Sequence, residues 1–438
     1  MLIKKAHDGI IVNKTLQMDV QGSKHSFSRV FPSFLQFKNG ILRNVPVIKD
    51  VEIQIDIMRR LGFKLDFDQD LNILKFSGIN EKQPHKSNIG DYSTKYSRSL
   101  INLYPLFSRY NIELKEPSGC SIGRRDISWY VEIMQEFGII ADIKDTRSIV
   151  YRRKDLNKVS EVHIRQRSFS STNIAITCAI EARSNTKIFR PSIEPEILEL
   201  VNMLEKTGVN IHYNQKNDYF HIFADTFDKS DFVDHTILPD RNVIVTLICG
   251  ALLQRKDIII NTYGFNEDQL QLSPFLKILK QLNISYQFLD NAIFTKGTFI
   301  PSKSVEVEIK AGHYPLFCSD WQPLIAVLSI LGVNMVIEDT LFESRFGYLN
   351  EYKKFGVKFK MINERQARII ASDDFKLNPE KIIKAKALDL RCGAGVGLLS
   401  LLHKGACEIE NAVQIMRGYE KFDDQLNNLL GEEVFSFV

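Results

Sequence analysis

The stretch VEIQIDIMRRLGFKLDF, residues 51–67, decides the fold. Its first part spaces apolar residues as an amphipathic helix does, and its last five residues alternate between apolar and polar as in a half-buried strand. Gly62 separates the two parts, and glycine accepts the left-handed conformation in which many helices end. The stretch therefore predicts a helix that ends at a glycine and leads directly into a strand.

The same pattern of helix, cap and strand occurs six times along the chain. The caps stand 70 to 76 positions apart, at Gly62, Gly138, Gly208, Asn283, Gly356 and Gly431. Further apolar stretches that could be helices lie between the copies, at 99–107, 172–182, 243–253, 321–331 and 395–402. A repeat of this length is too long for a helical solenoid and has room for two helices and several strands. We therefore predict an α/β protein of six repeated units, three in each of two domains.

Composition narrows the class of protein. Of the 438 residues, 44% are hydrophobic and 25% are charged, and the net charge is +4. These values are ordinary for a soluble globular protein. The mild positive charge fits small anionic ligands at least as well as nucleic acid, and the sequence has no basic stripe that would predict nucleic-acid binding. The longest apolar runs, 243–253 and 323–337, are too short to cross a bilayer, so we expect no membrane insertion.

The cysteines and histidines point to the same class. The six cysteines are scattered without CxxC pairs, which favours reduced thiols and a cytoplasmic location. The nine histidines show no metal-ligand spacing, so we expect no metal site.

A glycine-rich loop, KEPSGCSIGRRD at 115–126, is the first candidate for chemistry. Cys120 lies in its middle and Arg125 follows closely. A neighbouring cation lowers the pKa of a thiol, and guanidinium groups suit phosphate or carboxylate. By itself, the loop is better explained as a surface turn with an incidental cysteine and a solvated basic pair.

Two helix entries are rich in hydroxyls. Residues 22–29, GSKHSFSR, place Lys24 and His25 at a predicted helix start, where an anion could bind. Residues 167–172, RSFSST, place Ser168 and Ser170 at another. Plain N-capping explains either entry, and it is the favoured explanation for the second.

Aspartates and arginines stand at further element boundaries. Asp240, in LPDR, precedes an apolar run and reads as a helix cap, whereas Asp320, in YPLFCSDWQ, fits a cap or a general base. Arg345, Arg391 and Arg417 each stand at a boundary, where a solvated cation is the simpler interpretation. The polar stretch at 226–235 is predicted to be a loop.

Taken together, these motifs resemble the enolpyruvyltransferase family over nearly the whole chain, most closely its UDP-N-acetylglucosamine 1-carboxyvinyltransferase branch. The motifs are GCSIGRR at 119–125, EPEI at 194–197, LPDR at 238–241, YPLFCSDWQ at 314–322, FESRF at 342–346, DLR at 389–391 and RGYE at 417–420. The resemblance implies a two-domain inside-out α/β barrel. It also implies a catalytic domain of residues 1–23 plus 238–438 and an inserted domain of residues 24–237 that carries the Cys120 loop.

The resemblance also implies a reaction. Phosphoenolpyruvate donates its enolpyruvyl group to an acceptor hydroxyl and phosphate leaves, without a metal or an organic cofactor. By this resemblance Cys120 delivers a proton, Asp320 is the base, and Lys24, Arg125 and Arg417 hold the donor phosphate and its departing charge. Arg345 and Arg391 line the donor and carboxylate region.

The acceptor side departs from the branch pattern. The segment 126–130 reads DISWY where the branch has Pro-Val-Asp-Leu-His, His25 replaces an asparagine, and Arg98 stands one place from the expected arginine. Ser168 and Ser170 also resemble a phosphate site of the sister branch, 5-enolpyruvylshikimate-3-phosphate synthase. The acceptor is thus left open between UDP-N-acetylglucosamine, another nucleotide such as UMP, and a shikimate-3-phosphate-like alcohol, for cell-wall or nucleotide-derived metabolite biosynthesis. A catalytically silent binding homologue is the alternative from another class.

Overall fold

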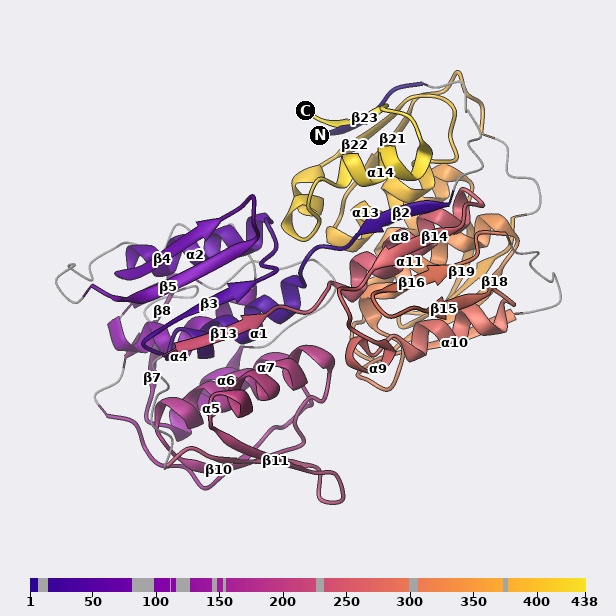
Figure 1. The fold of residues 1–438 in the computed structure, drawn as a ribbon. Coiled ribbons are helices and arrows are strands. Elements are labelled where there is room, and N and C mark those ends of the chain that lie inside the picture. Colours follow the sequence, from indigo (N-terminus) through magenta and orange to yellow (C-terminus); the bar gives the residue numbers. More distant parts are fainter. Residues whose placement is uncertain are drawn as a thin grey trace. The chain divides into compact units, whose positions relative to one another are not determined.

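The protein is described here by a computed structural model, which covers residues 1–6, 15–80, 98–110, 112–115, 127–143, 148–152, 155–225, 232–298, 306–372 and 377–438 (Figure 1). The chain forms two compact units. Unit 1 contains Met1–Gln21 and Pro239–Val438, and unit 2 is built from the described residues between Gly22 and Leu238. Within the described residues, every helix is too short or too polar to span a bilayer.

The six predicted caps are confirmed as the ends of six helices, and a strand follows each cap. The glycines have φ angles between 84° and 96°, and Asn283 has φ 55°. The first copy, for example, consists of α2 (Lys49–Arg60), Gly62 and β4 (Phe63–Asp68). Left-handed backbone is unstrained at glycine and tolerated at asparagine, which is why these residue types mark the junctions.

Each unit contains three of the six sheets in the described part of the chain. In four of them two parallel strands stand at one edge and an antiparallel hairpin completes the sheet, as in the sheet of β17 (Glu306–Ala311), β18 (Asn334–Asp339), β20 (Gln366–Ile370) and β19 (Lys358–Asn363). In a fifth, the two antiparallel strands are β1 (Leu2–Lys4) and β23 (Phe435–Phe437), which lie far apart in the sequence. The sixth sheet has three antiparallel strands in the order β6 (Ile112–Lys115), β8 (Ser148–Arg152) and β7 (Ile140–Ile143). The recurring topology confirms six repeated α/β units, three in each half of the structure.

The strands and helices of unit 1 are as follows. Its strands are β1 (Leu2–Lys4), β2 (Leu16–Asp19), β14 (Ile258–Asn261), β15 (Tyr286–Phe288), β16 (Ala292–Thr295), β17 (Glu306–Ala311), β18 (Asn334–Asp339), β19 (Lys358–Asn363), β20 (Gln366–Ile370), β21 (Ile383–Lys386), β22 (Cys407–Glu410) and β23 (Phe435–Phe437). Its helices are α8 (Arg241–Leu253), α9 (Glu267–Leu270), α10 (Ser273–Gln281), η3 (Ser319–Trp321), α11 (Gln322–Ala326), η4 (Val327–Leu331), η5 (Arg345–Gly347), α12 (Tyr348–Tyr352), η6 (Lys353–Phe355), α13 (Leu390–Ser400), η7 (Ala412–Arg417) and α14 (Phe422–Leu430).

Unit 2 has the same kinds of element. Its strands are β3 (Asn39–Arg43), β4, β5 (Ile73–Ile79), β6 (Ile112–Lys115), β7 (Ile140–Ile143), β8 (Ser148–Arg152), β9 (Glu161–His163), β10 (Asn185–Phe189), β11 (Asn210–Asn214), β12 (Tyr219–Phe223) and β13 (Phe232–Thr236). Its helices are α1 (Lys24–Phe34), α2, η1 (Arg98–Leu103), α4 (Tyr104–Phe107), η2 (Ser108–Tyr110), α5 (Ser128–Glu136), α6 (Phe169–Glu181) and α7 (Pro195–Lys206).

Helices fill the interior of unit 1. Every residue of α8 and α13 is buried, which fits their nearly continuous apolar sequences. By contrast α10 and α14, which precede the strands β15 and β23, bury only one face. The fully buried helices place the sheets on the outside, and both α13 and α11, which follows Asp320, contact α8.

The loop predicted at 226–235 is wrong for its last four residues, whereas 226–231 lie outside the described residues. The stretch 226–235 was expected to be a loop, but β13 begins at Phe232 and pairs in parallel with β3. Its side chains alternate between exposed and buried, as in a strand. The polar residues of FVDHT made this alternation hard to recognise in the sequence.

Candidate active site

The acidic centre of unit 1 is Asp320, which lies in the short helix η3 between β17 and α11. Its carboxylate lies between two arginines. Asp320 Oδ1 accepts a hydrogen bond from Arg345 Nη2 at 2.9 Å, and Asp320 Oδ2 accepts one from Arg391 Nε at 3.1 Å. Both oxygens are therefore oriented, while the Asp320 side chain keeps 26% of its surface exposed.

Asp389 completes this cluster from the start of α13. One of its oxygens caps the helix by accepting bonds from the backbone N–H groups of Arg391 and Cys392, at 2.7 and 2.9 Å. The other lies 3.8 Å from Arg345 Nη1. Two carboxylates and two guanidiniums thus converge from η3, η5 and α13, three segments far apart in the sequence.

The guanidinium of Arg391 is the most distinctive group of the cluster. It is 2% exposed, and its Nη1 and Nη2 atoms have no hydrogen-bond partner among the described residues. The Tyr419 ring lies 5.4 Å from its Cζ, and Tyr419 itself shares a 2.9 Å hydrogen bond with Thr246. A buried cation with two unsatisfied nitrogens is a strong site for an anion.

Electrostatics keep Arg391 charged. Burial disfavours the cation, but Tyr419, Asp320 and Asp240 outweigh this effect and raise the pKa of Arg391. Asp240 is fully buried and caps α8, accepting bonds from the N–H groups of Asn242 and Val243 at 2.8 and 3.4 Å. The cap expected from sequence is confirmed, and Asp240 also adds negative charge near Arg391.

Arg417 approaches from the end of η7 and is half-buried. Its Nη1 donates to Gln414 at 2.7 Å. The segment after it is held by Gln21, which donates to the Gly418 carbonyl at 3.1 Å and accepts from the Glu420 N–H at 2.7 Å. Arg417 precedes Tyr419 by two residues, and the Tyr419 ring packs against Arg391.

In unit 2, the helix entry at α1 contains Lys24. Ser23 caps α1 by accepting from the Ser26 N–H at 3.2 Å, and the Lys24 ammonium pairs with the buried carboxylate of Asp50. His25 Nδ1 lies 3.2 Å from Arg29 Nη1. The N-capping expected as the simpler interpretation is present, together with a nearly buried lysine at the helix start.

The second helix entry is the start of α6. Ser168 caps α6 by accepting from the Ser171 N–H at 3.4 Å, and Ser170 is half-buried in the first turn. The Arg29 guanidinium, from the middle of α1, lies 5.3 Å from the Phe169 ring at the start of α6. Cys120 and Arg125 lie outside the described residues, as does the side chain of Arg98.

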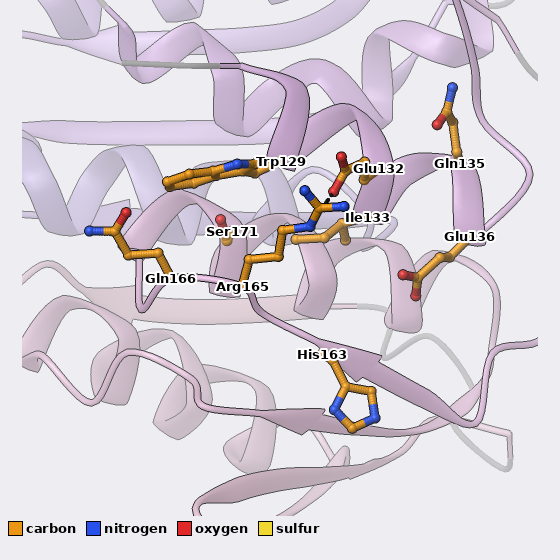
Figure 2. A pocket seen from close by; sticks show the side chains of 9 residues that line it. All are labelled: Trp129, Glu132, Ile133, Gln135, Glu136, His163, Arg165, Gln166 and Ser171. Carbon is orange, nitrogen blue, oxygen red and sulfur yellow. Dashed lines mark ion pairs between the residues drawn. The ribbon is translucent and has the colours of Figure 1, made fainter. Parts of the chain in front are cut away.

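A pocket of about 400 Å³ opens beside α5 in the same unit (Figure 2). Trp129 and Gln166 lie at one side of it, and Gln135 and Glu136 lie at the other. Its remaining lining residues are Glu132, Ile133, His163, Arg165 and Ser171. The residues come from α5, β9, the segment leading into α6 and the first turn of α6. Because these segments are separated in the sequence, the pocket could not be predicted from it.

The pocket is polar and carries both charges. Arg165 Nε lies 3.0 Å from Glu132 Oε2, an ion pair visible as a dashed line in Figure 2. Burial raises the pKa of Glu136, and neighbouring His163 partly offsets this shift. An indole face beside amides and a carboxylate suits a flat ring with polar edges.

The chain is similar to several known proteins. The family described as EPSP synthase (3-phosphoshikimate 1-carboxyvinyltransferase) matches residues 17–426. A UDP-N-acetylglucosamine 1-carboxyvinyltransferase of Campylobacter jejuni is 25% identical over 414 residues, and one of Campylobacter hominis is 27% identical over 418; each alignment covers 94% of both chains. The crystal structure of the enolpyruvyl transferase NikO from Streptomyces tendae superposes with a TM-score of 0.81 at 18% identity, covering 98% of this chain and 97% of the other.

Proposed function

The chain belongs to the EPSP synthase family and is a 1-carboxyvinyltransferase, and we propose that it transfers the enolpyruvyl group of phosphoenolpyruvate to a hydroxyl of a nucleotide or nucleotide sugar. UDP-N-acetylglucosamine is the first candidate acceptor, because that substrate appears in the names of the curated relatives. We also propose a cytoplasmic location, where phosphoenolpyruvate and such nucleotides occur.

The proposed reaction balances as an addition followed by an elimination. The acceptor oxygen bonds to C2 of phosphoenolpyruvate while C3 gains a proton, which gives a tetrahedral intermediate. Loss of a proton from C3 and cleavage of the bond from C2 to the phosphate oxygen then release phosphate and the enol ether. The site must therefore accept the hydroxyl proton, exchange a proton at C3 and hold two anionic groups.

The main support for the proposed reaction is the cluster of Asp320, Arg345 and Arg391. A carboxylate whose two oxygens are both oriented, and which keeps partial access to solvent, suits the role of base for the acceptor hydroxyl. The free nitrogens of Arg391 suit the donor carboxylate or the phosphate that leaves. A protein that only binds its ligand has no need for a carboxylate held between two guanidiniums beside an unsatisfied anion site.

Roles are also proposed for residues of unit 2. Lys24 stands at the N-terminus of the 11-residue helix α1, where both the ammonium and the helix dipole favour phosphate. We propose that Lys24 and Arg125 bind the donor phosphate and that Cys120 exchanges the proton at C3. Ser168 and Ser170, at the start of α6, are proposed to bind the acceptor.

The pocket beside α5 supports a nucleotide acceptor. The Trp129 indole offers a stacking surface for a base, and Gln166 and Glu132 offer donors and acceptors for its edge. Because these side chains are not those of the carboxyvinyltransferase branch pattern, a nucleotide other than UDP-N-acetylglucosamine, such as UMP, is the second candidate acceptor.

The first test measures phosphate release from phosphoenolpyruvate with UDP-N-acetylglucosamine, UMP and shikimate 3-phosphate as acceptors, and identifies the enol ether by NMR. Asp320→Asn should lower kcat at least 100-fold with phosphoenolpyruvate affinity changed less than about fivefold. Asp234→Asn is the matched control, because it breaks an exposed pair with Arg43 and should leave kcat unchanged. Absence of phosphate release with every acceptor would refute the proposal and favour a silent binding homologue.

The second test addresses the acceptor. Trp129→Ala should raise the acceptor KM about tenfold, since stacking on an aromatic ring contributes about 1–3 kcal/mol per base, while the KM for phosphoenolpyruvate stays constant. Trp129→Phe retains an aromatic ring, so its acceptor KM should lie between those of wild type and Trp129→Ala. Equal acceptor KM values in all three proteins would exclude the pocket from acceptor binding.

A further inference from the structure

A second buried carboxylate lies beside the Asp320 cluster and has no place in the reaction described above. Asp339 is the last residue of β18 and is 0% exposed. Its two oxygens accept four hydrogen bonds. Among the described residues, no cationic group forms an ion pair with it, so neutral donors balance its charge.

The four bonds divide by oxygen. Oδ1 accepts from the backbone N–H groups of Leu341 and Phe342, at 2.7 and 2.8 Å. Oδ2 accepts from the Ser319 hydroxyl and the Gln322 amide, both at 2.5 Å. The first pair is a local turn of the kind that aspartate commonly forms, whereas the second pair reaches back 17 and 20 residues.

These partners flank the two residues that form the ion pair. Ser319 directly precedes Asp320, and the turn at 341–342 leads within three residues to Arg345. One carboxylate therefore ties together the two segments that bring Asp320 and Arg345 to 2.9 Å. A capping aspartate would need only the local turn, so the long-range bonds require another explanation.

The energetics point the same way. Burying a carboxylate is costly, and well-packed neutral side chains would stabilise this region at least as well. Charge-assisted bonds to a carboxylate are, however, shorter and stronger than neutral ones, so they hold both segments within a narrow range of positions. Catalytic geometry is sensitive on this scale, because a displacement of about 1 Å can cost about 100-fold in rate.

We propose that Asp339 is a positioning residue, which fixes Asp320 relative to Arg345 through Ser319 on one side and the 341–342 turn on the other. The inference rests on the proposed function for its effect on turnover. Its structural part, the coupling of the two segments, can be tested independently.

Three variants distinguish the long-range hydrogen bonds of Asp339 from its local turn at 341–342. Ser319→Ala removes one long-range bond and leaves the local turn intact. Asp339→Ala removes all four bonds. Asn334→Ala is the matched control, because Asn334 begins the same strand and its side chain accepts a 2.9 Å bond from the Ala371 N–H, at the other end of β18.

Hydrogen exchange measured by mass spectrometry tests the coupling. Peptides covering 318–322 should exchange at least fivefold faster in Ser319→Ala and Asp339→Ala, and peptides covering 341–345 should do so only in Asp339→Ala. Asn334→Ala should change neither region. Unchanged exchange at 318–322 in both variants would overturn the inference, whether or not the protein turns over.

Kinetics test the consequence. With an active acceptor, kcat should fall about 5–30-fold in Ser319→Ala and about 100-fold in Asp339→Ala, while the acceptor KM changes less than threefold. A variant could also lose activity because part of the protein is unfolded. Each variant is therefore assayed at least 10 °C below its own melting temperature, where it is folded. If wild type releases no phosphate with any acceptor, the proposed function fails, and the exchange data still decide whether Asp339 couples the segments. Wild-type kcat in both variants would refute a positioning role.

Discussion

Substituting Gly395 by alanine should disrupt the packing that places Arg391. Gly395 lies one turn beyond Arg391 on α13 and faces α12. A Cβ at this position would lie 1.5 Å from the Tyr352 hydroxyl oxygen and 2.6 Å from its ring carbon Cζ. Tyr352 is 0% exposed and donates to the Pro323 carbonyl at 2.8 Å, so the ring can move only by breaking a buried hydrogen bond.

The magnitude follows from three opposing effects. Alanine is intrinsically better than glycine in a helix by about 1 kcal/mol. Overpacking a core costs about 1–3 kcal/mol, and leaving the buried hydroxyl and carbonyl unpaired costs about 1–3 kcal/mol more. We expect a net loss of about 2–4 kcal/mol in the free energy of unfolding. For a unit of roughly 200 residues this lowers the melting temperature by about 5–15 °C.

Differential scanning calorimetry of Gly395→Ala measures this loss. Gly347→Ala is the control, because its Cβ would meet nothing closer than 3.7 Å and its φ of −55° suits any residue. The double variant Gly395→Ala with Tyr352→Phe should recover only part of the loss, since the ring carbon still obstructs the methyl group. A Gly395→Ala protein that melts at or above the wild-type temperature would refute the reasoning.

Three further predictions concern stability and anion binding. Burial lowers the pKa of Lys4 to about 8. Between pH 8 and about 10.5, Lys4 is therefore protonated in the unfolded chain but neutral in the folded one. The free energy of unfolding should rise with pH over this range, by on the order of 1–3 kcal/mol relative to Lys4→Met. Urea unfolding at pH 7.5 and 10 checks this, and a constant difference between the two proteins would contradict it. Glu199→Ala should lower the free energy of unfolding by about 2–4 kcal/mol, because it removes the buried carboxylate that lies 3.0 Å from His235. A decrease below about 1 kcal/mol in the same urea assay would show that the pair contributes little to stability. Tyr419→Leu should weaken phosphoenolpyruvate binding about 3–30-fold by removing the ring 5.4 Å from Arg391, and calorimetry should find Tyr419→Phe within twofold of wild type.

The repeated fold could be predicted from sequence because its junctions are local. Each helix ends where backbone geometry demands glycine or asparagine, so one residue in each copy marks the change from helix to strand. The strand β13 was missed for the opposite reason. Its parallel partner β3 lies some 190 residues earlier, and its five residues expose Phe232 and bury His235, which reverses the usual apolar-in, polar-out pattern of a strand.

The candidate site could be predicted only in part. Motif order singled out Asp320, Arg345 and Arg391, and the structure brings these three together. The partners that orient them were not foreseen, since an aspartate such as Asp389 reads as a plain cap until its second oxygen is found near Arg345. The pocket beside Trp129 likewise depends on tertiary packing between α5 and the start of α6, which no single stretch of sequence records.

The strand pairing of unit 1 has a consequence for how the chain folds during synthesis. Strand β1 pairs with β22 and β23, and β2 pairs with β14, whereas the elements of unit 2 follow one another between Gly22 and Leu238. At a ribosomal rate of about 5–20 residues per second, β2 waits about 10–50 s for its partner and β1 waits about 20–80 s. Unit 2 can complete its sheets in that interval while two earlier strands remain unpaired. The unit that contains Asp320 is therefore the last to fold, and β1 and β2 are the segments that a molecular chaperone would have to shield longest.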